Sequence, residues 1–291
     1  MKNEKVLTQA MIISMFCWGL GWASNKVLSG YGSATAISFY RFFITTISLF
    51  VIGFFLKEKI TFNLKTFWIV LLSSVCLSLY TYFFILGLSV GLSGAGGVLV
   101  TTLNPIITFI LTLILTLKKP SKLATIGLLV GALAACVLLK IWDNLDAIFT
   151  GGNLFFLIAT VLWSVLSRFT SLSKQFSSPI VFSLWMYFIC TVTMFFASNG
   201  KEIVEIYVQS DNIFWLNMFF SGTITTALAT TLYFYATSKL GVNKASSFIF
   251  LVPLSAAFGS WIFLSETPQW HTIVGGILGV LAVYIISKEK V

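Results

Sequence analysis

Long apolar segments fill most of this chain and limit what it can fold into. A helix that crosses a bilayer needs about 20 mainly apolar residues, and about ten such segments follow one another with short polar breaks between them. The expected spans are 6–28, 34–56, 66–86, 91–117, 123–140, 152–173, 179–198, 212–236, 241–265 and 271–287. Only 9% of the residues are charged, against about 25% in soluble domains. The sequence therefore predicts an all-α polytopic membrane protein, with a first span too long for a cleaved signal.

The lysines are distributed unevenly between the two sides of the membrane. Thirteen of them fall at the two termini and in the loops that follow even-numbered spans, whereas only Lys26, Lys140 and Lys201 fall on the opposite side. Lysine-rich loops stay in the cytoplasm, so we expect both termini to be cytoplasmic in a plasma (inner) membrane. The net charge of +9 thus indicates orientation, and no nucleic-acid partner is predicted.

An internal repeat divides the chain into two halves. A spacing of 145 residues aligns Trp18 with Trp163, and a spacing of 148 aligns Pro105 with Pro253, Pro120 with Pro268, Gly127 with Gly275 and Gly131 with Gly279. The expected units are a first five-helix repeat (1–140), a connecting outer loop (141–151) and a second five-helix repeat (152–291). Because five is odd, the second half enters the membrane from the opposite side. The sequence therefore predicts ten transmembrane helices arranged as two inverted repeats, which are typical of secondary transporters.

The chain resembles the drug/metabolite transporter superfamily, specifically its EamA-type branch, in four segments. These are "FCWGLGWASNKVL" in span 1, "AISFYRFFITTISLF" in span 2, "SGAGGVLVTTLNPIITFILTLIL" in span 4 and "NKASSFIFLVPLSAAFGSWIFLSETP" in span 9. The resemblance implies export or exchange of small metabolites through a central cavity lined mainly by spans 1, 3, 4, 6, 8 and 9. The chain departs from the family where Asn104 and Val252 precede the prolines, since many relatives have glutamate there, and where span 4 ends in "LKKP" against "LSETP" in the second half. Relatives that depend on that glutamate are a poor guide to coupling here.

Aromatic and amide side chains supply most of the candidate substrate-binding residues. Trp18, Trp22 and Asn25 recur at spacings of four and three, so they share one face of span 1. Rings bind apolar or cationic groups, while hydroxyl, indole and amide groups add directional hydrogen bonds. The remaining candidates of this kind are Tyr80, Tyr82, Asn104, Trp163, Tyr233 and Tyr235. The alternative role for each of these rings is packing or anchoring at the membrane interface.

Pro105 and Pro253 each fall well inside an apolar span. Proline removes a backbone donor and frees the carbonyl one turn earlier, and lipid cannot satisfy that carbonyl. We therefore expect both prolines to be hinge or kink residues. Asn104 and the pair Thr101 and Thr102 could repair the break or contact substrate.

Arg41 and Arg168 are the only arginines in a chain that has sixteen lysines. Either side chain could snorkel to nearby headgroups. Either could instead direct its planar, permanently charged fork at an anionic group. We count Arg168 among the candidate substrate-binding residues and assign Arg41 to an outer gate.

The absence of some residue types excludes several kinds of chemistry. No acidic residue lies in the middle of a span, and the only histidine, His271, opens the last one. A buried carboxylate proton relay therefore has no candidate. An enzyme is not predicted, because neither a nucleophile with its base nor a metal-binding set such as HExxH is present. No cofactor or metal is expected, and the four cysteines are read as buried thiols.

These observations predict a secondary-type transporter that exports or exchanges a small metabolite, most simply an amino-acid-like or zwitterionic one, by alternating access. The alternative is an exporter of cationic or lipophilic compounds, of the multidrug or quaternary ammonium type, that uses an aromatic cage. A ligand-sensing or structural membrane protein would share the same fold. The expected partners are the small-molecule substrate and the lipid bilayer, and the paired glycines could also form a homodimer interface.

Overall fold

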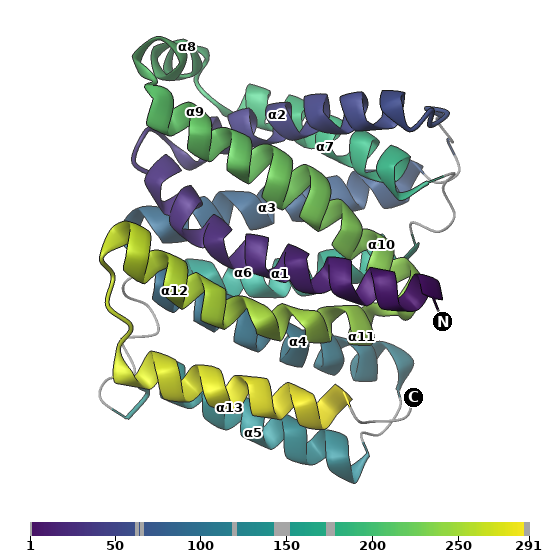
Figure 1. Ribbon diagram of the computed structural model, residues 1–291, viewed down its shortest axis with the longest axis vertical. Helices are drawn as coiled ribbons and strands as arrows, with labels where there is room; N and C mark the ends of the chain where they lie inside the picture. The colour runs from purple at the N-terminus through teal and green to yellow at the C-terminus, as the bar shows by residue number, and fades with distance from the viewer. Residues whose placement is uncertain are drawn as a thin grey trace.

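The computed structural model describes residues 2–61, 64, 67–117, 121–142, 152–172 and 178–287, and the regular structure in these ranges is helical. Figure 1 shows the helices lying side by side in one bundle. The first half contains α1 (Lys2–Leu28), α2 (Ala34–Phe55), α3 (Phe67–Val90), α4 (Ser93–Thr116) and α5 (Lys122–Leu139). The second half contains α6 (Asn153–Thr170), α7 (Pro179–Ala197), α8 (Gly200–Gln209), α9 (Asn212–Phe219), η3 (Phe220–Thr230), α10 (Thr231–Leu240), α11 (Val242–Ser247), η4 (Phe248–Leu251), α12 (Val252–Leu264) and α13 (Trp270–Ser287).

The number of spans agrees with the sequence. In the described part of the chain, nine helical segments are long and apolar enough to cross a membrane, and α13 is a further apolar helix. The prediction of an all-α polytopic membrane protein is confirmed. Most of the expected connecting loop (143–151) and several lysine-bearing stretches, 118–120, 173–177 and 288–291, lie outside the described residues.

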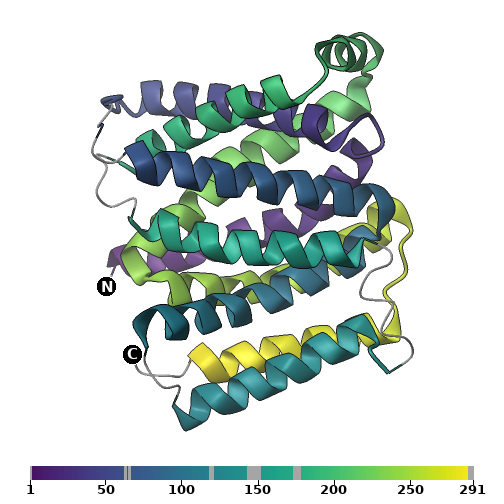
Figure 2. The ribbon, with the colours of Figure 1, turned by 180° about the vertical axis from the view of Figure 1, so that it is seen from behind.

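The two halves pack as related units. α2 packs against its counterpart α7, and α5 packs against its counterpart α13. The other contacts come in matched pairs: α1 packs on α12 as α6 packs on α4, and α1 packs on η3 as α6 packs on α3. Figures 1 and 2 show the α2 and α7 pair at one edge of the bundle and the α5 and α13 pair at the other. Exchanging the halves preserves this pattern, which is what a pseudo-two-fold axis between inverted repeats produces.

Equivalent residues of the two halves meet at this axis. The hydroxyl groups of Thr46 and Thr191, which are 145 positions apart, share a hydrogen bond of 3.1 Å. The rings of Phe42 and Tyr187, also 145 positions apart, lie with their centroids 5.8 Å apart. The spacing of the sequence repeat is thus reproduced as direct contacts between α2 and α7.

Serine side chains fix the start of several membrane helices. Ser33, Ser121 and Ser178 each accept a hydrogen bond from the backbone N–H three residues later, at the starts of α2, α5 and α7. Such a cap satisfies one of the amide groups that a helix leaves unpaired in its first turn. The polar breaks between apolar segments therefore set where these spans begin.

Small residues allow α5 and α13 to approach each other and α4 closely. A Cβ added at Gly131 would meet Ile106 and Ala282, one at Gly275 would meet Leu138, and one at Gly279 would meet Thr102. These glycines of the paired motifs are used for packing within the chain.

Spans 8 and 9 are less regular than the sequence indicates. Span 8 changes from α-helix to π-helix over Phe220–Thr230 and back again. Span 9 is broken by the 3₁₀ turn η4, and Pro253 lies in the first turn of α12, where its missing N–H costs nothing. Pro105, by contrast, lies inside an uninterrupted α4. The short helix α8, which lies across the end of the bundle in Figure 1, was not predicted.

Candidate functional site

A cavity lies between the two halves, close to the pseudo-two-fold axis. Its volume is about 60 Å³, enough to hold water. Its lining includes Trp18, Trp22 and Asn25 from α1, Arg41 and Phe42 from α2, Tyr80, Thr81 and Phe84 from α3, Thr101 and Asn104 from α4, Trp163 from α6, Tyr187 from α7, Thr225, Thr226 and Thr230 from η3, and Ile249 from η4. The six spans that the family resemblance implied all contribute, and α2 and α7 contribute as well.

The shared face of α1 points into this cavity as its periodicity predicts. Trp22 is buried and packs edge to face on Phe84, with ring centroids 4.8 Å apart. Asn25 lines the cavity, but its amide is already bonded on both sides: Nδ2 donates to the Gly21 carbonyl at 2.7 Å, and Oδ1 accepts from the Ser221 hydroxyl at 2.8 Å. Asn25 therefore braces α1 against η3 in this conformation.

Trp18 connects α1 to the π-helical segment. Its indole Nε1 donates to the Thr225 carbonyl at 3.0 Å and to the Thr230 hydroxyl at 3.1 Å. Thr226 and Thr230 donate in turn to carbonyls five residues earlier, those of Ser221 and Thr225. In the widened helix, backbone carbonyls thus accept hydrogen bonds from side-chain hydroxyls and from an indole. π-Helical segments are rare and occur frequently at functional sites.

Four aromatic rings form one side of the cavity and its backing. Trp163 lies edge to face with Trp18, with centroids 5.2 Å apart, and its ring lies 4.7 Å from that of Tyr80. Tyr233 lies behind these rings, 5.1 Å from Trp18, fully buried and hydrogen-bonded to Ser167 at 2.9 Å. Tyr233 therefore supports the wall and is not among the lining residues.

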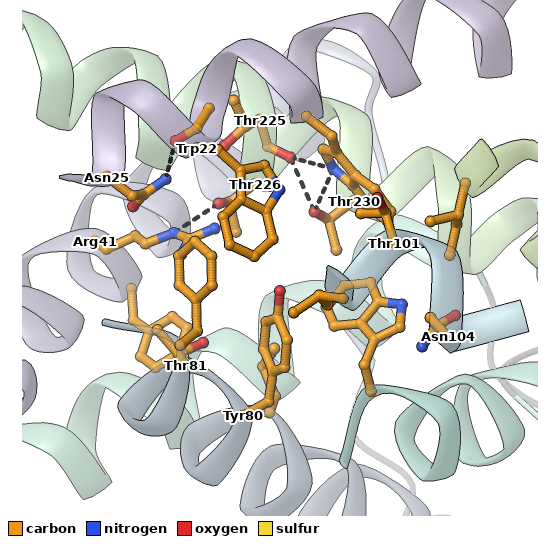
Figure 3. A pocket seen from close by; sticks show the side chains of 18 of the residues that line it. Trp22, Asn25, Arg41, Tyr80, Thr81, Thr101, Asn104, Thr225, Thr226 and Thr230 are labelled. Atoms are coloured by element: carbon orange, nitrogen blue, oxygen red, sulfur yellow. Dashed lines mark hydrogen bonds between the residues drawn. The ribbon is translucent and has the colours of Figure 1, made fainter. Parts of the chain in front are cut away.

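Arg41 extends from α2 toward the cavity. Its Nε donates to the Thr226 hydroxyl at 3.1 Å, and its Cζ lies 5.6 Å from the centroid of the Phe84 ring. Its Nη1 is buried and makes no hydrogen bond to any described residue. In Figure 3 the side chains of Arg41 and Tyr80 both point toward the middle of the cavity. The outer-gate role remains a prediction, but the guanidinium itself faces inward.

Several other polar atoms of the lining are also unpaired. Asn104 donates through Nδ2 to Ser164 at 3.1 Å, while its Oδ1 accepts no hydrogen bond of ordinary geometry from the described residues. Trp163 Nε1 and Tyr187 Oη likewise make no hydrogen bond of ordinary geometry with the described residues. Buried polar groups are nearly always paired, because leaving one unpaired costs about 1–3 kcal/mol. The cavity therefore offers both donors and an acceptor to whatever occupies it.

Three predicted site residues lie away from the cavity. Tyr82 is two residues from Tyr80, and Tyr235 is two from Tyr233, so each pair points to opposite sides of its helix. Tyr235 lines a separate apolar groove bordered by α2, α7 and α10, with Lys239 Nζ 5.7 Å from its ring centroid. Arg168 is exposed in the last turn of α6, where a cation faces the carbonyl end of the helix.

Tyr187 and the threonines of η3 line the cavity but were not predicted to do so. Tyr187 could have been found, because it stands 145 positions after Phe42 and so occupies the equivalent place in the second half. The run "SGTITTALATT" is rich in hydroxyls for a membrane span, and that enrichment was the available signal for η3.

Acidic side chains tie the two halves together at one end of the bundle. Glu266, after α12, accepts hydrogen bonds from the Gly94 N–H at 2.9 Å and the Ser93 hydroxyl at 3.2 Å, at the start of α4. Glu202, on α8, accepts from the N–H and the hydroxyl of Ser33 at 2.6 and 2.8 Å, at the start of α2. A carboxylate at a helix N-terminus is favoured by the helix dipole.

A third contact at this end joins Asp211 to Tyr31. The Tyr31 hydroxyl donates to Asp211 Oδ1 at 2.8 Å, and the same oxygen accepts from the Phe214 N–H at 2.8 Å. The bond from the Phe214 backbone, followed by the one from Tyr31, lowers the pKa of the Asp211 carboxyl below its ordinary value. The bond to Asp211 raises the pKa of the Tyr31 phenol.

Comparisons with known proteins agree with this fold. The model of the EamA-like transporter family matches the chain twice, over residues 8–140 and 150–288. The chain is 25% identical over 280 residues to the uncharacterized transporter YoaV of Bacillus subtilis, covering 94% of this chain and 95% of that protein. It is 22% identical to the WAT1-related protein At3g02690, chloroplastic, of Arabidopsis thaliana, covering 95% of this chain and 68% of that one. A solved crystal structure superposes with a TM-score of 0.66 and 15% identity over 96% of both chains.

Proposed function

Since the chain belongs to the EamA-like transporter family and is a multi-pass membrane protein, we propose that it exports or exchanges a small metabolite of amino-acid-like or zwitterionic type by alternating access. The two halves would rock about the pseudo-two-fold axis, so that the cavity opens to each side in turn. The bound molecule would lie against Trp18, Trp22, Tyr80 and Trp163, with Asn104 nearby.

One observation supports this proposal above the others. The cavity combines aromatic walls with unpaired polar atoms of both kinds: the donor Nη1 of Arg41 and the acceptor Oδ1 of Asn104. A zwitterion carries an acceptor group and a donor group, and it could satisfy both atoms at once. A site built for a purely apolar molecule has no use for them.

An aromatic cage for cationic or lipophilic compounds is the second candidate. The rings of Trp18, Trp22, Tyr80 and Trp163 favour it, because aromatic faces attract organic cations. A fixed positive charge in the same lining opposes it, since Arg41 would repel the cation.

The proposed orientation puts both termini in the cytoplasm of the plasma (inner) membrane. α1 begins and α13 ends at the same end of the bundle in Figure 1. α2 ends, α5 begins and α11 lies at that end, whereas α8 lies at the other. Lys57 and Lys59 follow α2, Lys122 begins α5 and Lys244 is on α11, while Lys201 is on α8. The excess of lysines on the side of the termini supports this assignment.

The experiment that tests the function is flux in reconstituted vesicles. Purified protein is inserted into liposomes loaded with radiolabelled amino acids, with the same unlabelled amino acids outside, and efflux is compared with protein-free liposomes and with liposomes that hold tetraethylammonium. Faster efflux of at least one amino acid supports the proposal. Protein-dependent efflux of the quaternary cation alone would favour the second candidate, and no flux of either kind would contradict both.

A further inference from the structure

We propose that Arg41 is the receptor for a carboxylate group on the molecule that the cavity binds. This deepens the proposed function by naming the group that the site recognises. It depends on that function only in assuming that the cavity is the binding site.

The charge of the cavity is the first step. Among the described residues that line it, Arg41 is the only one with a formal charge. In the sequence, none of the nine acidic residues falls in the middle of an expected span. The polar and aromatic neighbours of the guanidinium, Thr226 and Phe84, are neutral, so no ion pair neutralises it in the described structure.

The direction of the guanidinium is the second step. Thr226 occupies only Nε, while Nη1 is buried and unpaired, and it belongs to a side chain that faces the cavity. The phenol groups of Tyr80 and Tyr187 lie close enough to interact electrostatically with the charge, but neither is an anion at neutral pH. A snorkelling arginine would have its terminal nitrogens among headgroups. This one keeps donors available inside the bundle.

The chemistry of the missing partner is the third step. A guanidinium has a planar set of donors that matches the two oxygens of a carboxylate. One positive charge in a small buried space balances one negative charge, so a monocarboxylate fits better than a phosphate dianion. The unpaired donors Trp163 Nε1 and Tyr187 Oη belong to the same lining and could hold the same anion or its polar substituents. The rings around the cavity would then bind the apolar remainder.

This arrangement has a consequence for the transport cycle. Closing the cavity without an anion buries an unpaired charge, which is strongly unfavourable. Closing it with a carboxylate bound replaces the unpaired charge with an ion pair. The loaded carrier therefore changes conformation more readily than the empty one, which favours exchange over net flux.

Matched ligands test the inference on the purified protein. The probes are 3-phenylpropanoate, L-phenylalanine and phenethylamine, with propanoate, L-alanine and ethylamine as a smaller series, and the measurement is thermal stabilisation. At least one of the four probes that carry a carboxylate is expected to stabilise the native protein. Phenethylamine and ethylamine, which carry none, are expected not to stabilise it. Arg41→Gln should weaken that binding about ten- to hundredfold, as expected for a lost charge-assisted hydrogen bond. Arg41→Lys should retain part of it.

The second arginine provides the matched control. Arg168→Gln removes the same charge from an exposed position outside the cavity and should leave carboxylate binding unchanged. Stabilisation by the amines in place of the carboxylates would overturn the inference. So would equal binding by Arg41→Gln and native protein, or no binding of any carboxylate up to about 50 mM, well above a millimolar Kd.

Chemical modification gives a readout that does not require an Arg41 variant to fold. In Arg168→Lys protein, Arg41 is the only arginine, so phenylglyoxal labelling of the peptide that contains Arg41 reports on it alone. The carboxylate that stabilises the protein should slow this labelling, and the matching amine should not. Unprotected labelling contradicts the inference. Protection without vesicle flux would support the carboxylate site and contradict transport. Flux of cations without protection would support transport and contradict the carboxylate site.

Discussion

The indole rings of Trp18 and Trp163 occupy equivalent positions in the two halves and meet edge to face, with their centroids 5.2 Å apart and their planes at 84°. Their surroundings are not equivalent. Trp18 Nε1 donates to Thr225 and Thr230 of the π-helical segment, whereas Trp163 Nε1 is buried and makes no hydrogen bond of ordinary geometry with the described residues. One copy of a duplicated residue thus fixes the structure, and the other has an unused donor beside the cavity.

This asymmetry predicts that substitution by phenylalanine affects mainly stability at Trp18 and mainly ligand binding at Trp163. Trp18→Phe removes an interhelical hydrogen bond and should lower the free energy of unfolding by about 0.6–1.5 kcal/mol. Trp163→Phe removes no hydrogen bond of ordinary geometry, so it should lower the free energy of unfolding less than Trp18→Phe does, but it should weaken ligand binding if Nε1 donates to the ligand. Chemical denaturation and ligand-induced thermal shifts of both variants measure the two effects. Equal loss of stability in both would show that the bonding of Trp18 does not matter.

Much of the architecture could be predicted because its cause is local. A span is set by a run of apolar residues and ended by a cap or polar break, so the expected 34–56 and the observed Ala34–Phe55 nearly coincide. The spacing of 145 residues also indicated which positions would be equivalent, and Trp18 and Trp163 do meet at the axis. Helical periodicity likewise predicted correctly that Trp18, Trp22 and Asn25 share the cavity face.

The features that could not be predicted depend on contacts between distant segments. Hydropathy cannot distinguish a π-helix from an α-helix, and the π-helical turns at η3 are accompanied by hydroxyl bonds to carbonyls five residues earlier and by the indole of Trp18. The direction of Arg41 depends on Thr226, which is 185 positions away. Tyr80 and Tyr82 were both proposed for the site, although their spacing on one helix allows only one of them to face it.

Close packing around Phe156 predicts a site where a single methyl group is not tolerated. A Cβ added at Gly96 on α4 would come within 2.5 Å of the Phe156 ring, which also lies against Gly87 on α3. Gly96→Ala should therefore destabilise the protein by about 1–3 kcal/mol, the usual cost of overpacking a core. Gly200→Ala is the control, because nothing lies within 4 Å of a Cβ added there. Denaturation midpoints of the two variants decide the question, and an undiminished midpoint for Gly96→Ala would contradict the packing argument.

The carboxylates of Glu202 and Glu266 predict how the cavity is closed at the end where α8 lies. Each bonds the start of a helix in the other half, so Glu202→Ala or Glu266→Ala should favour opening at that end. The measurement is the labelling rate, by an impermeant maleimide, of a cysteine introduced at the cavity position Thr81 in a background without native cysteines. Both substitutions should raise this rate severalfold. Glu205→Ala, on the exposed side of α8, is the control. Labelling rates in the Glu202 and Glu266 variants equal to that of the control would contradict their role in closure.

The contact between Asp211 and Tyr31 predicts a pH dependence that can be worked out from its sign. The folded-state pKa of Asp211 is lowered, so its carboxylate stabilises the fold above the ordinary value of 3.8, and this contribution disappears as the pH falls through the folded-state value. The pKa of Tyr31 is raised above 10.0, so its phenol stabilises the fold below that value and loses this effect as the pH rises through its folded-state pKa. Asp211→Asn should therefore lower the thermal midpoint at neutral pH, with the difference from native protein closing below about pH 4.

Tyr31→Phe should also lower the thermal midpoint, and its difference from native protein should close only above about pH 10. Thermal unfolding across both ranges measures these gaps, and gaps that do not change with pH would mean that the hydrogen bond contributes nothing to stability.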